Sequence, residues 1–210
     1  MNSLIMVIIA LIAAYFIGST PAPYLAGRIF KKIDIRTVGS KNMGSMNVFY
    51  NVGFWPGILV LTTDIGKGAL AMAVANWLGE GLGIQMLCAL MAIAGHNYPV
   101  WLKFKGGKGG ATAIGILAYM MPEGIPIYIA CFLILMAITR FPTLSYGISF
   151  ISFILVAWLG QHDMGKVLFS LLVVMIPILM YIPRMKEIKN KAGSGNAKRA
   201  IFRRNLKERL

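Results

Sequence analysis

Apolar runs separated by short polar segments dominate the chain and restrict its fold more than any other feature. A transmembrane helix needs about 20 predominantly apolar residues. Because 58% of the 210 residues are hydrophobic and only seven are acidic, the composition excludes a soluble domain with a polar exterior. The sequence predicts an all-α integral membrane protein, a bundle of about seven short helices. The predicted spans are roughly 4–26, 53–78, 82–98, 111–121, 125–139, 144–159 and 165–183.

The first and fourth runs differ from ordinary spans. No basic segment precedes the first run and no small-residue cleavage site follows it, so we expect a span there rather than a removed signal peptide. The fourth run has about 11 residues, which cover only about 17 Å of helix. We expect it to be a half-span or to extend into the preceding glycines.

The distribution of basic residues predicts how the chain is oriented, because Lys and Arg accumulate on the cytoplasmic side of a membrane. With seven spans and the N-terminus outside, the inward segments hold 19 of the 21 Lys and Arg residues. The outward turns hold Glu80, Glu123 and Asp163 instead. The C-terminus is then cytoplasmic.

This orientation gives a simple domain organisation. We expect one transmembrane domain over residues 1–183, with cytoplasmic loops at 28–52 and 96–111. A basic cytoplasmic tail follows over residues 184–210, and its stretch 189–200 has the composition of a linker. The tail is interpreted as solvated or facing lipid headgroups.

Several classes of function lack the residues that they need. The net charge of +14 suggests nucleic acid, but the basic residues lie between apolar runs and no aromatic RNA-binding motif accompanies them. Cys88 and Cys131 lie inside apolar runs without disulfide or metal-ligand spacing. No G-x-S-x-G motif, Cys–His pair or carboxylate cluster occurs, and His162 lies on an outward turn. We expect neither a metal nor a cofactor, and no covalent intermediate on the protein.

Three polar stretches share the predicted cytoplasmic side. In the first, residues 18–47, Ser19 and Pro21 lie at membrane depth, where irregular backbone must be buried in protein or line a cavity. A loop rich in Ser, Asn and Gly follows around Arg36, whose guanidinium can bind a phosphate through two hydrogen bonds. An ordinary cytoplasmic turn that follows the charge rule is the alternative interpretation.

The second stretch, "GHNYPVWLKFKGGKGGAT" at 95–112, is rich in glycine and lysine. It is not a nucleotide-binding P-loop, because Lys108 is followed by Gly109 rather than Ser or Thr. Glycine-rich backbone N–H groups flanked by Lys105 and Lys108 favour a small phosphorylated ligand. His96 can donate to that ligand or act as a base, although such a histidine more often satisfies a nearby backbone group.

The third stretch places Asp64 and Lys67 inside the second span. Ionisable residues within a membrane are costly and usually paired, and an i, i+3 spacing puts these two on one helix face. A structural or site-orienting ion pair is the favoured interpretation, ahead of direct chemistry.

These stretches resemble a known family. "GSTPAPYLAGRIFKKIDIRTVGSKNMGSMN" and "GHNYPVWLKFKGGKGGAT" are similar to the first two signature motifs of the bacterial acyl-phosphate:glycerol-3-phosphate acyltransferases, the PlsY family. "LVLTTDIGKGAL" matches the family's Asp-x-x-Lys-Gly helix. The resemblance implies a compact seven-helix enzyme that transfers a fatty acyl group from acyl phosphate to the 1-hydroxyl of glycerol 3-phosphate. The products are lysophosphatidic acid and phosphate, at the first acylation of phospholipid synthesis.

The resemblance also implies site residues and partners. Glycerol 3-phosphate and a long-chain acyl phosphate are the expected substrates, membrane lipid surrounds the protein, and no nucleic acid is expected. We expect a monomer, with the enzyme that makes acyl phosphate as a candidate partner. The expected catalytic residues are Lys108, Arg36, Ser40 and Asn205. The expected substrate-binding residues are Ser19, Gly39, Asn42, Gly44, Asn47, His96, Lys105, Gly106, Gly107, Gly109, Gly110 and Thr112.

Three positions depart from the family pattern. Met46 stands where the family has threonine, and Tyr50 where it has a phosphate-binding arginine. Phe202 replaces the histidine that begins the third motif, although Asn205 is retained. These departures keep two alternatives open. One is a divergent paralogue with another substrate or low activity, and the other is an anion transporter or a protein that binds lipid headgroups.

Overall fold

The computed structural model describes the backbone of residues 3–201 and the side chains of residues 4–183. Within these ranges the chain forms helices and short connections, without a strand. The predicted site residue Asn205 and the departure at Phe202 lie outside the described residues. In chain order the elements are α1 (Ser3–Gly18), α2 (Ala22–Lys31), α3 (Ser45–Asn51), α4 (Phe54–Trp77), α5 (Leu82–Asn97), η1 (Val100–Leu102), α6 (Gly110–Met120), α7 (Gly124–Thr139), α8 (Pro142–Ser149), α9 (Ile151–Leu155), the π-helical η2 (Val156–Gly160) and α10 (Met164–Ile201).

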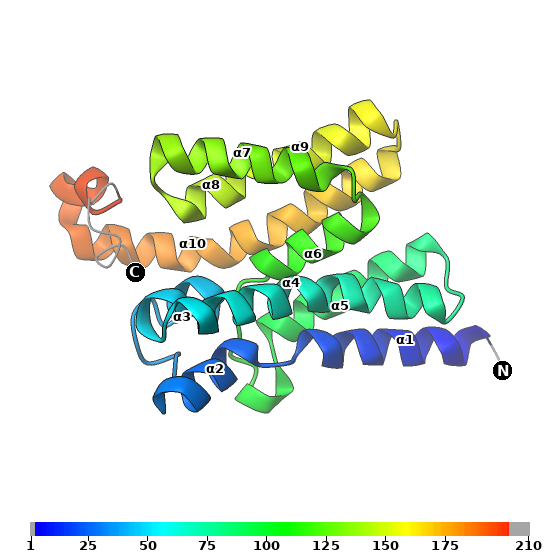
Figure 1. Ribbon diagram of the computed structural model, residues 1–210, viewed down its shortest axis with the longest axis horizontal. Coiled ribbons are helices and arrows are strands. Elements are labelled where there is room, and N and C mark those ends of the chain that lie inside the picture. Colours follow the sequence, from blue (N-terminus) through cyan, green and yellow to red (C-terminus); the bar gives the residue numbers. More distant parts are fainter. Residues whose placement is uncertain (1–2, 202–210) are drawn as a thin grey trace.

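The helices form one bundle with distinct ends (Figure 1). α1 packs against α4 and α5, α6 packs on α4, and α7 packs on α8. The short helices α2 and α3 lie at one end, and the N-terminus lies at the other. Residues from the two polar loops are therefore brought to the end of the bundle that carries α2 and α3.

The first predicted span is interrupted rather than continuous over residues 4–26. α1 ends at Gly18, and α2 begins at Ala22. Pro21 has no N–H for a helical hydrogen bond and disfavours helical backbone at the residue before it, so the helix breaks there. The break produces the irregular backbone that Ser19 and Pro21 indicate in the sequence.

In the part of the chain that the structure describes, four segments are long and apolar enough to cross a membrane: Leu4–Lys31, Phe54–Trp77, Pro142–Gly160 and Met164–Pro183. α6 is apolar but has only 11 residues, as the short fourth run predicts. These helices match the prediction of an all-helical membrane protein, whereas the number of spans and the orientation of the termini stay predictions. α10 continues through the predicted linker at 189–200, although Gly193 and Gly195 in that stretch are poor helix formers.

Exposed tryptophans mark two levels along the bundle. Trp55 and Trp77 lie near opposite ends of α4 and are 77% and 83% exposed. Their separation of 22 residues corresponds to about 33 Å of helix, close to the hydrocarbon thickness of a bilayer. Trp101 and Trp158 are also exposed. Tryptophan is enriched at both membrane interfaces, and this spacing is what a membrane-spanning α4 requires.

Glycines allow α4 and α6 to pack with their backbones in near contact. A Cβ atom on Gly68 would lie 2.2 Å from the carbonyl oxygen of Thr112, and one on Gly115 would lie 1.8 Å from that of Ile65. Small residues permit such close packing between membrane helices. The contact brings the Asp64 region of α4 next to the start of α6, where the glycine loop ends.

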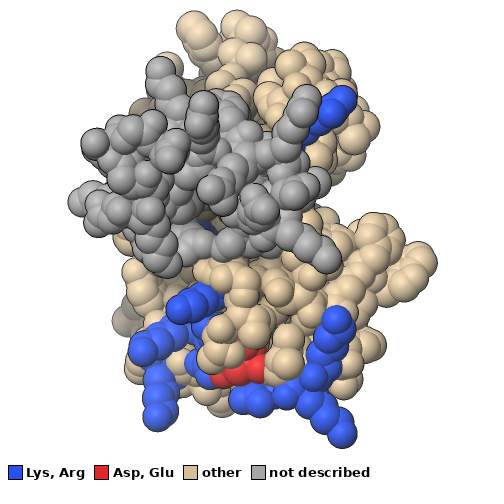
Figure 2. All heavy atoms as spheres, turned by 90° about the vertical axis from the view of Figure 1, so that its left-hand side faces the viewer, with Lys and Arg blue, Asp and Glu red and all other residues tan. Residues whose placement is uncertain are grey.

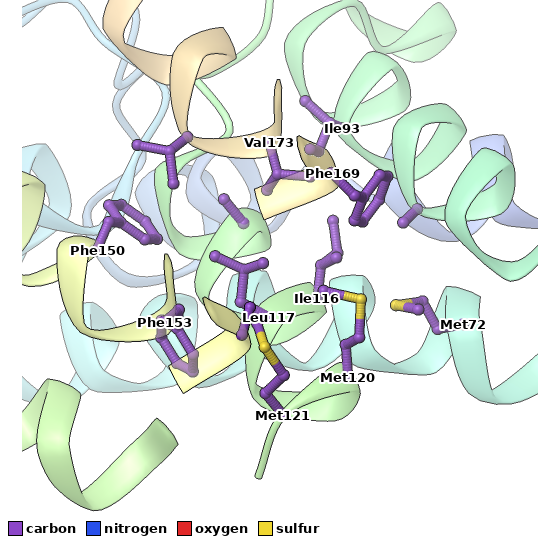
Figure 3. Packing of buried hydrophobic residues seen from close by; sticks show 14 of the residues in the cluster. Met72, Ile93, Ile116, Leu117, Met120, Met121, Phe150, Phe153, Phe169 and Val173 are labelled. Atoms are coloured by element: carbon purple, nitrogen blue, oxygen red, sulfur yellow. The ribbon is translucent and has the colours of Figure 1, made fainter. Parts of the chain in front are cut away.

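The main hydrophobic core lies around α6 (Figure 3). Ile116 and Leu117 are fully buried and pack with Phe150 and Phe153 of the α8–α9 region and Val173 of α10. A second cluster of small side chains, Ala10, Ala14, Ala71, Ala75, Cys88 and Ala92, joins α1, α4 and α5. α6 is thus fixed on several sides, which gives its N-terminus a rigid support.

Candidate functional site

The loop between α2 and α3 is organised around the side-chain amide of Asn47. Its Nδ2 atom donates to the carbonyl oxygens of Ile35 and Asn42, at 2.9 and 3.0 Å. Its Oδ1 atom accepts from the backbone N–H of Ser40 at 3.2 Å. Gly39 has a φ of +55° and lies so close that a Cβ atom would be 2.4 Å from Asn47 Oδ1. The glycine and the asparagine together fix the backbone around Ser40.

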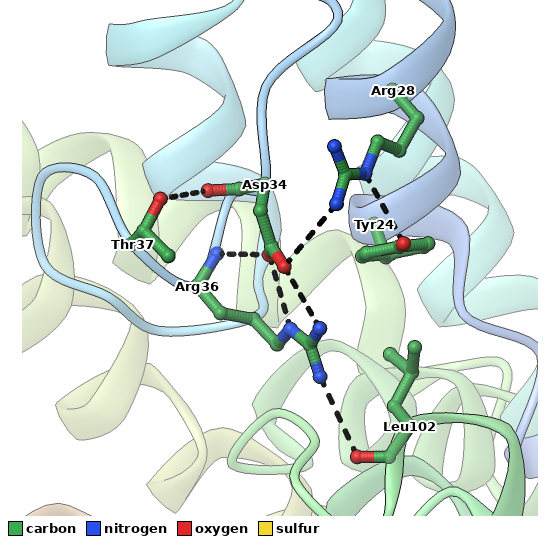
Figure 4. Close-up of polar contacts among 6 residues, drawn as sticks. All are labelled: Tyr24, Arg28, Asp34, Arg36, Thr37 and Leu102. Carbon is green, nitrogen blue, oxygen red and sulfur yellow. Dashed lines mark hydrogen bonds and ion pairs between the residues drawn. The ribbon is translucent and has the colours of Figure 1, made fainter.

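Arg36 is held by Asp34 in the same loop (Figure 4). Its Nε and Nη2 atoms donate to the two carboxylate oxygens at 3.0 and 2.8 Å, and Nη1 reaches the carbonyl oxygen of Leu102 at 3.5 Å. The hydrogen bond from the Arg36 side chain is the main reason that the pKa of Asp34 lies below its ordinary value. Arg36 therefore ties the first loop to η1.

The glycine loop folds back onto the end of α5. The N–H groups of Gly106 and Gly107 donate to the carbonyl oxygens of Asn97 and His96, each at 3.0 Å. A Cβ atom on Gly107 would lie 2.1 Å from His96 Nε2 and 2.4 Å from the carbonyl oxygen of Met43. The two predicted loops thus meet at Gly107, and only a residue without a side chain fits there.

The glycine loop ends at the N-terminus of α6. Gly109 precedes the helix with a φ of +81°, a conformation that favours glycine, and no side chain caps the helix. The first N–H groups of such a helix carry partial positive charge and form a favourable place for an anion. Lys108 lies directly before this terminus, and its Nζ atom is 3.8 Å from the centre of the Tyr181 ring on α10.

A buried polar cluster lies below the loops. Lys67 Nζ is 2.7 Å from Asp64 Oδ1 and also donates to the carbonyl oxygen of Thr20 at 3.2 Å. His96 Nδ1 is 3.7 Å from the same Asp64 oxygen. All three side chains are at least 96% buried. The structure contains the ion pair that the i, i+3 spacing predicts, with a histidine beside it.

One cavity of about 500 Å³ connects these parts. Its polar half includes residues of both loops, the start of α6 and the buried cluster: Ser40, Asn42, Gly44, Ser45, Asn47, Asp64, His96, Lys108, Gly109 and Gly110. Its apolar half is lined by side chains of α4, α6, α7 and α9: Leu61, Ile65, Ile114, Ala118, Ile125, Ile129, Phe132 and Phe153. Such a cavity suits a ligand with an anionic head and a hydrocarbon chain.

Basic side chains surround this end of the molecule. Figure 2 shows Lys and Arg gathered around a small acidic patch, on the side that carries α2. Asp34 forms ion pairs there with Arg28 and Arg36, and Lys31 and Lys32 are exposed nearby at the end of α2. The local excess of positive charge attracts anionic ligands and anionic lipid headgroups.

Comparisons with known proteins show the family to which the chain belongs. The family model for glycerol-3-phosphate acyltransferase matches residues 8–191. The chain belongs to the glycerol-3-phosphate acyltransferase family. It is 96% identical over its whole length to glycerol-3-phosphate acyltransferase 2 of Dehalococcoides mccartyi, which it also covers completely. It is 37% identical to glycerol-3-phosphate acyltransferase 1 of the same organism, over 89% of this chain and 93% of that protein.

A solved member of the glycerol-3-phosphate acyltransferase family has the same fold. The crystal structure of PlsY, an integral membrane glycerol 3-phosphate acyltransferase, in its glycerol 3-phosphate form matches with a TM-score of 0.76. The two chains are 26% identical, and the match covers 87% of this chain and 91% of that one. The family resemblance and the all-helical membrane fold expected from the sequence are both confirmed.

The predicted site residues fall into two groups. Eight of them line the cavity: Ser40, Asn42, Gly44, Asn47, His96, Lys108, Gly109 and Gly110. The others described are not among its lining residues: Ser19, Arg36, Gly39, Lys105, Gly106, Gly107 and Thr112. Ser19 instead accepts a hydrogen bond from Trp101 Nε1 at 3.1 Å, and Lys105 is exposed. The roles of both groups as ligands of substrate stay predictions.

Several cavity residues were not predicted from the sequence. Tyr128 and Tyr146 belong to α7 and α8, and Tyr181 belongs to α10. Each lies in an apolar run whose pattern indicates only a membrane span. Met46 and Tyr50, the two departures from the family pattern that the structure describes, also line the cavity. The positions that could alter substrate preference therefore face the same space as Lys108.

Proposed function

We propose that the chain transfers a fatty acyl group from acyl phosphate to the 1-hydroxyl of glycerol 3-phosphate, giving lysophosphatidic acid and phosphate. One observation carries this proposal. A single cavity joins a polar half beside Lys108 and the α6 N-terminus to an apolar half lined by side chains of α4, α6, α7 and α9. The polar half suits the phosphates of both substrates, and the apolar half suits the acyl chain.

The reaction needs little covalent chemistry from the protein. A new bond forms between the glycerol oxygen and the acyl carbon, and the bond from that carbon to the phosphate oxygen breaks. The hydroxyl proton leaves with the phosphate, which can accept it directly. Because acyl phosphate is already activated, positioning and electrostatic stabilisation are sufficient.

Lys108 and the first N–H groups of α6 are the groups proposed to bind the phosphate of glycerol 3-phosphate and to stabilise the departing phosphate. Both lie at the same wall of the cavity, and both carry positive charge. Ser40 faces the same space from the other loop and is proposed to hold a phosphate oxygen. Arg36 is paired with Asp34 and donates to Leu102, so its proposed contribution is to hold the first loop against η1.

The apolar half is proposed to hold the acyl chain of the donor. Leu61 and Ile65 of α4 line this half together with Ile125, Ile129 and Phe132 of α7. Asp64 lies about 14 Å along α4 from Trp55, which places the junction of the two halves at hydrocarbon depth. A lipid-soluble donor can therefore bind without taking its chain into water.

The proposed location is the bacterial plasma membrane with the cavity open to the cytoplasm. Basic side chains gather on the side of the molecule that carries α2, and the loop that follows α2 supplies Ser40 and Asn42 to the cavity. Lys and Arg accumulate on the cytoplasmic side of a membrane. Glu80, Glu123 and Asp163 lie in turns between helices, in the segments predicted to face outward. A monomer stays the expected oligomeric state.

The test is an assay of purified protein with glycerol 3-phosphate and three donors: palmitoyl phosphate, palmitoyl-CoA and palmitoyl acyl carrier protein. We expect phosphate release and lysophosphatidic acid only with palmitoyl phosphate, and only when glycerol 3-phosphate is present. Turnover with palmitoyl-CoA would contradict the proposed donor. No product with any donor would favour a divergent paralogue or a protein that only binds anions.

A further inference from the structure

Asp64 and His96 face the cavity with buried polar atoms that lack hydrogen bonds. They come from α4 and α5, and both line the cavity. Among the described residues, neither Asp64 Oδ1 nor His96 Nδ1 has a hydrogen-bond partner, although both atoms are fully buried. Buried polar atoms almost always have such a partner. Two unsatisfied atoms 3.7 Å apart at a cavity wall indicate a polar ligand.

Lys67 explains why a carboxylate is tolerated there but does not use its full capacity to accept hydrogen bonds. Its Nζ atom forms an ion pair with Asp64 Oδ1 at 2.7 Å and also donates to the carbonyl oxygen of Thr20, and a carboxylate oxygen can accept more than one hydrogen bond. A buried carboxylate needs an opposite charge, and Lys67 supplies it. Asp64 therefore keeps capacity to accept a hydrogen bond from something in the cavity.

The position of Asp64 and His96 in the cavity indicates which chemical group of a ligand they would contact. Asp64 is followed by Ile65, which lines the apolar half, and His96 lies against Gly107, which precedes Lys108. The pair thus occupies the junction between the phosphate end and the hydrocarbon end. A hydroxyl group has a hydrogen to donate and lone pairs to accept, which suits a carboxylate beside an imidazole.

We propose that Asp64 and His96 form the subsite for the glycerol hydroxyls of the acceptor. Asp64 accepts a hydrogen bond from the 2-hydroxyl, and His96 fixes the same hydroxyl through a ring nitrogen. This contact turns the 1-hydroxyl toward the acyl carbonyl at the junction. The inference deepens the proposed function and rests on glycerol 3-phosphate as the acceptor. The pair positions the acceptor, and the hydroxyl proton still leaves with the phosphate.

The test compares glycerol 3-phosphate with 3-hydroxypropyl phosphate, which lacks only the 2-hydroxyl. In the unmodified protein, kcat/KM should be about tenfold to a hundredfold higher for glycerol 3-phosphate, because one hydrogen bond to a charged group is lost with the analogue. In His96→Gln and Asp64→Asn this ratio should fall toward one, since the analogue has no bond to lose. Thr62→Val, at an exposed position of α4, should keep the ratio.

The outcomes separate positioning from a structural role. Equal losses with both acceptors, leaving the ratio unchanged, would overturn the subsite. So would equal use of the two acceptors by the unmodified protein. Asp64→Asn leaves Lys67 without its charge partner, so Asp64→Asn with Lys67→Met supplies a charge-balanced variant in which the ratio should also fall. No turnover of either acceptor by the unmodified protein would overturn the proposed function as well.

Discussion

Gly107 and Met43 are 64 residues apart in sequence, yet a Cβ atom on Gly107 would lie 2.4 Å from the Met43 carbonyl oxygen. The same Cβ would lie 2.1 Å from His96 Nε2. Any other residue at position 107 would place its Cβ atom inside these distances, so only glycine fits there. The two polar loops are therefore joined at one point, directly before Lys108.

Gly107→Ala should separate the loops and remove most of the activity. The added methyl group meets a carbonyl oxygen and a buried ring, so one loop must move away from the other. A displacement of about 1 Å can cost about a hundredfold in rate. Gly81→Ala is the matched control, since among the described residues nothing beyond its own chain neighbours lies within 4 Å of its Cβ position. Normal kcat/KM in Gly107→Ala would contradict the role of this contact.

Gly66 and Gly68 on α4 should respond in opposite ways to alanine. Gly68→Ala places a methyl group 2.2 Å from the Thr112 carbonyl oxygen and should destabilise the protein by about 1–3 kcal/mol. Gly66→Ala meets nothing within 4 Å and should stabilise the helix by about 0.5–1 kcal/mol. Unfolding of the two variants in detergent measures the difference. Similar stabilities would show that α4 and α6 are not packed as described.

Lys108→Met should lower kcat by about a hundredfold to a thousandfold, because it removes a preorganised charge from the phosphate end of the cavity. The methylene stem is kept, so membrane insertion and stability should change little. Lys31→Met, at an exposed position on α2, should retain normal turnover. A rate in Lys108→Met within a few-fold of that control would exclude Lys108 from catalysis.

The contact between Asp34 and Arg36 should give a pH-dependent contribution to stability. The pKa of Asp34 is lowered in the folded protein, chiefly by the Arg36 hydrogen bond. A lowered pKa stabilises the fold above the unfolded value of about 3.9, and this contribution is lost as pH falls through the folded value. The Tm difference between the unmodified protein and Asp34→Asn should thus be largest near neutral pH and shrink below about pH 4. A difference that is constant with pH would contradict this source of stability.

Ala118→Phe should shift donor preference toward shorter acyl chains. Ala118 lies on α6 in the apolar half of the cavity, where an aromatic ring would occupy space proposed for the chain. The KM for palmitoyl phosphate should rise more than the KM for lauroyl phosphate. Ala137→Phe, at an exposed position of α7, is the control and should not alter the ratio. An unchanged ratio in Ala118→Phe would mean that the chain binds elsewhere.

Patterns that depend on near neighbours could be predicted from the sequence. Apolar runs predict the helices, and the i, i+3 spacing predicts the pair of Asp64 and Lys67. The glycines and lysines that predict the anion-binding loop are neighbours in the sequence. Lys108 and Gly109, consecutive in that loop, both line the cavity.

Contacts between distant residues could not be predicted in the same way. His96 meets Asp64 only because α5 and α4 pack side by side. Ser19 accepts a hydrogen bond from Trp101, 82 residues away, and is not among the residues that line the cavity. Arg36 has the expected bidentate geometry, but with Asp34 as its partner. The sequence shows which hydrogen bonds and charges these side chains can offer, whereas the tertiary packing determines which residues they contact.

The central claim is that two loops distant in sequence bind one and the same phosphorylated acceptor. The most direct measurement is a double-mutant cycle on glycerol 3-phosphate binding, measured by calorimetry without a donor, with Ser40→Ala from one loop and Lys108→Met from the other. Groups that share a ligand should be coupled, so the effect of the double variant should differ from the sum by about 0.5–3 kcal/mol. Strictly additive effects, or an unchanged Kd in either single variant, would contradict a shared site.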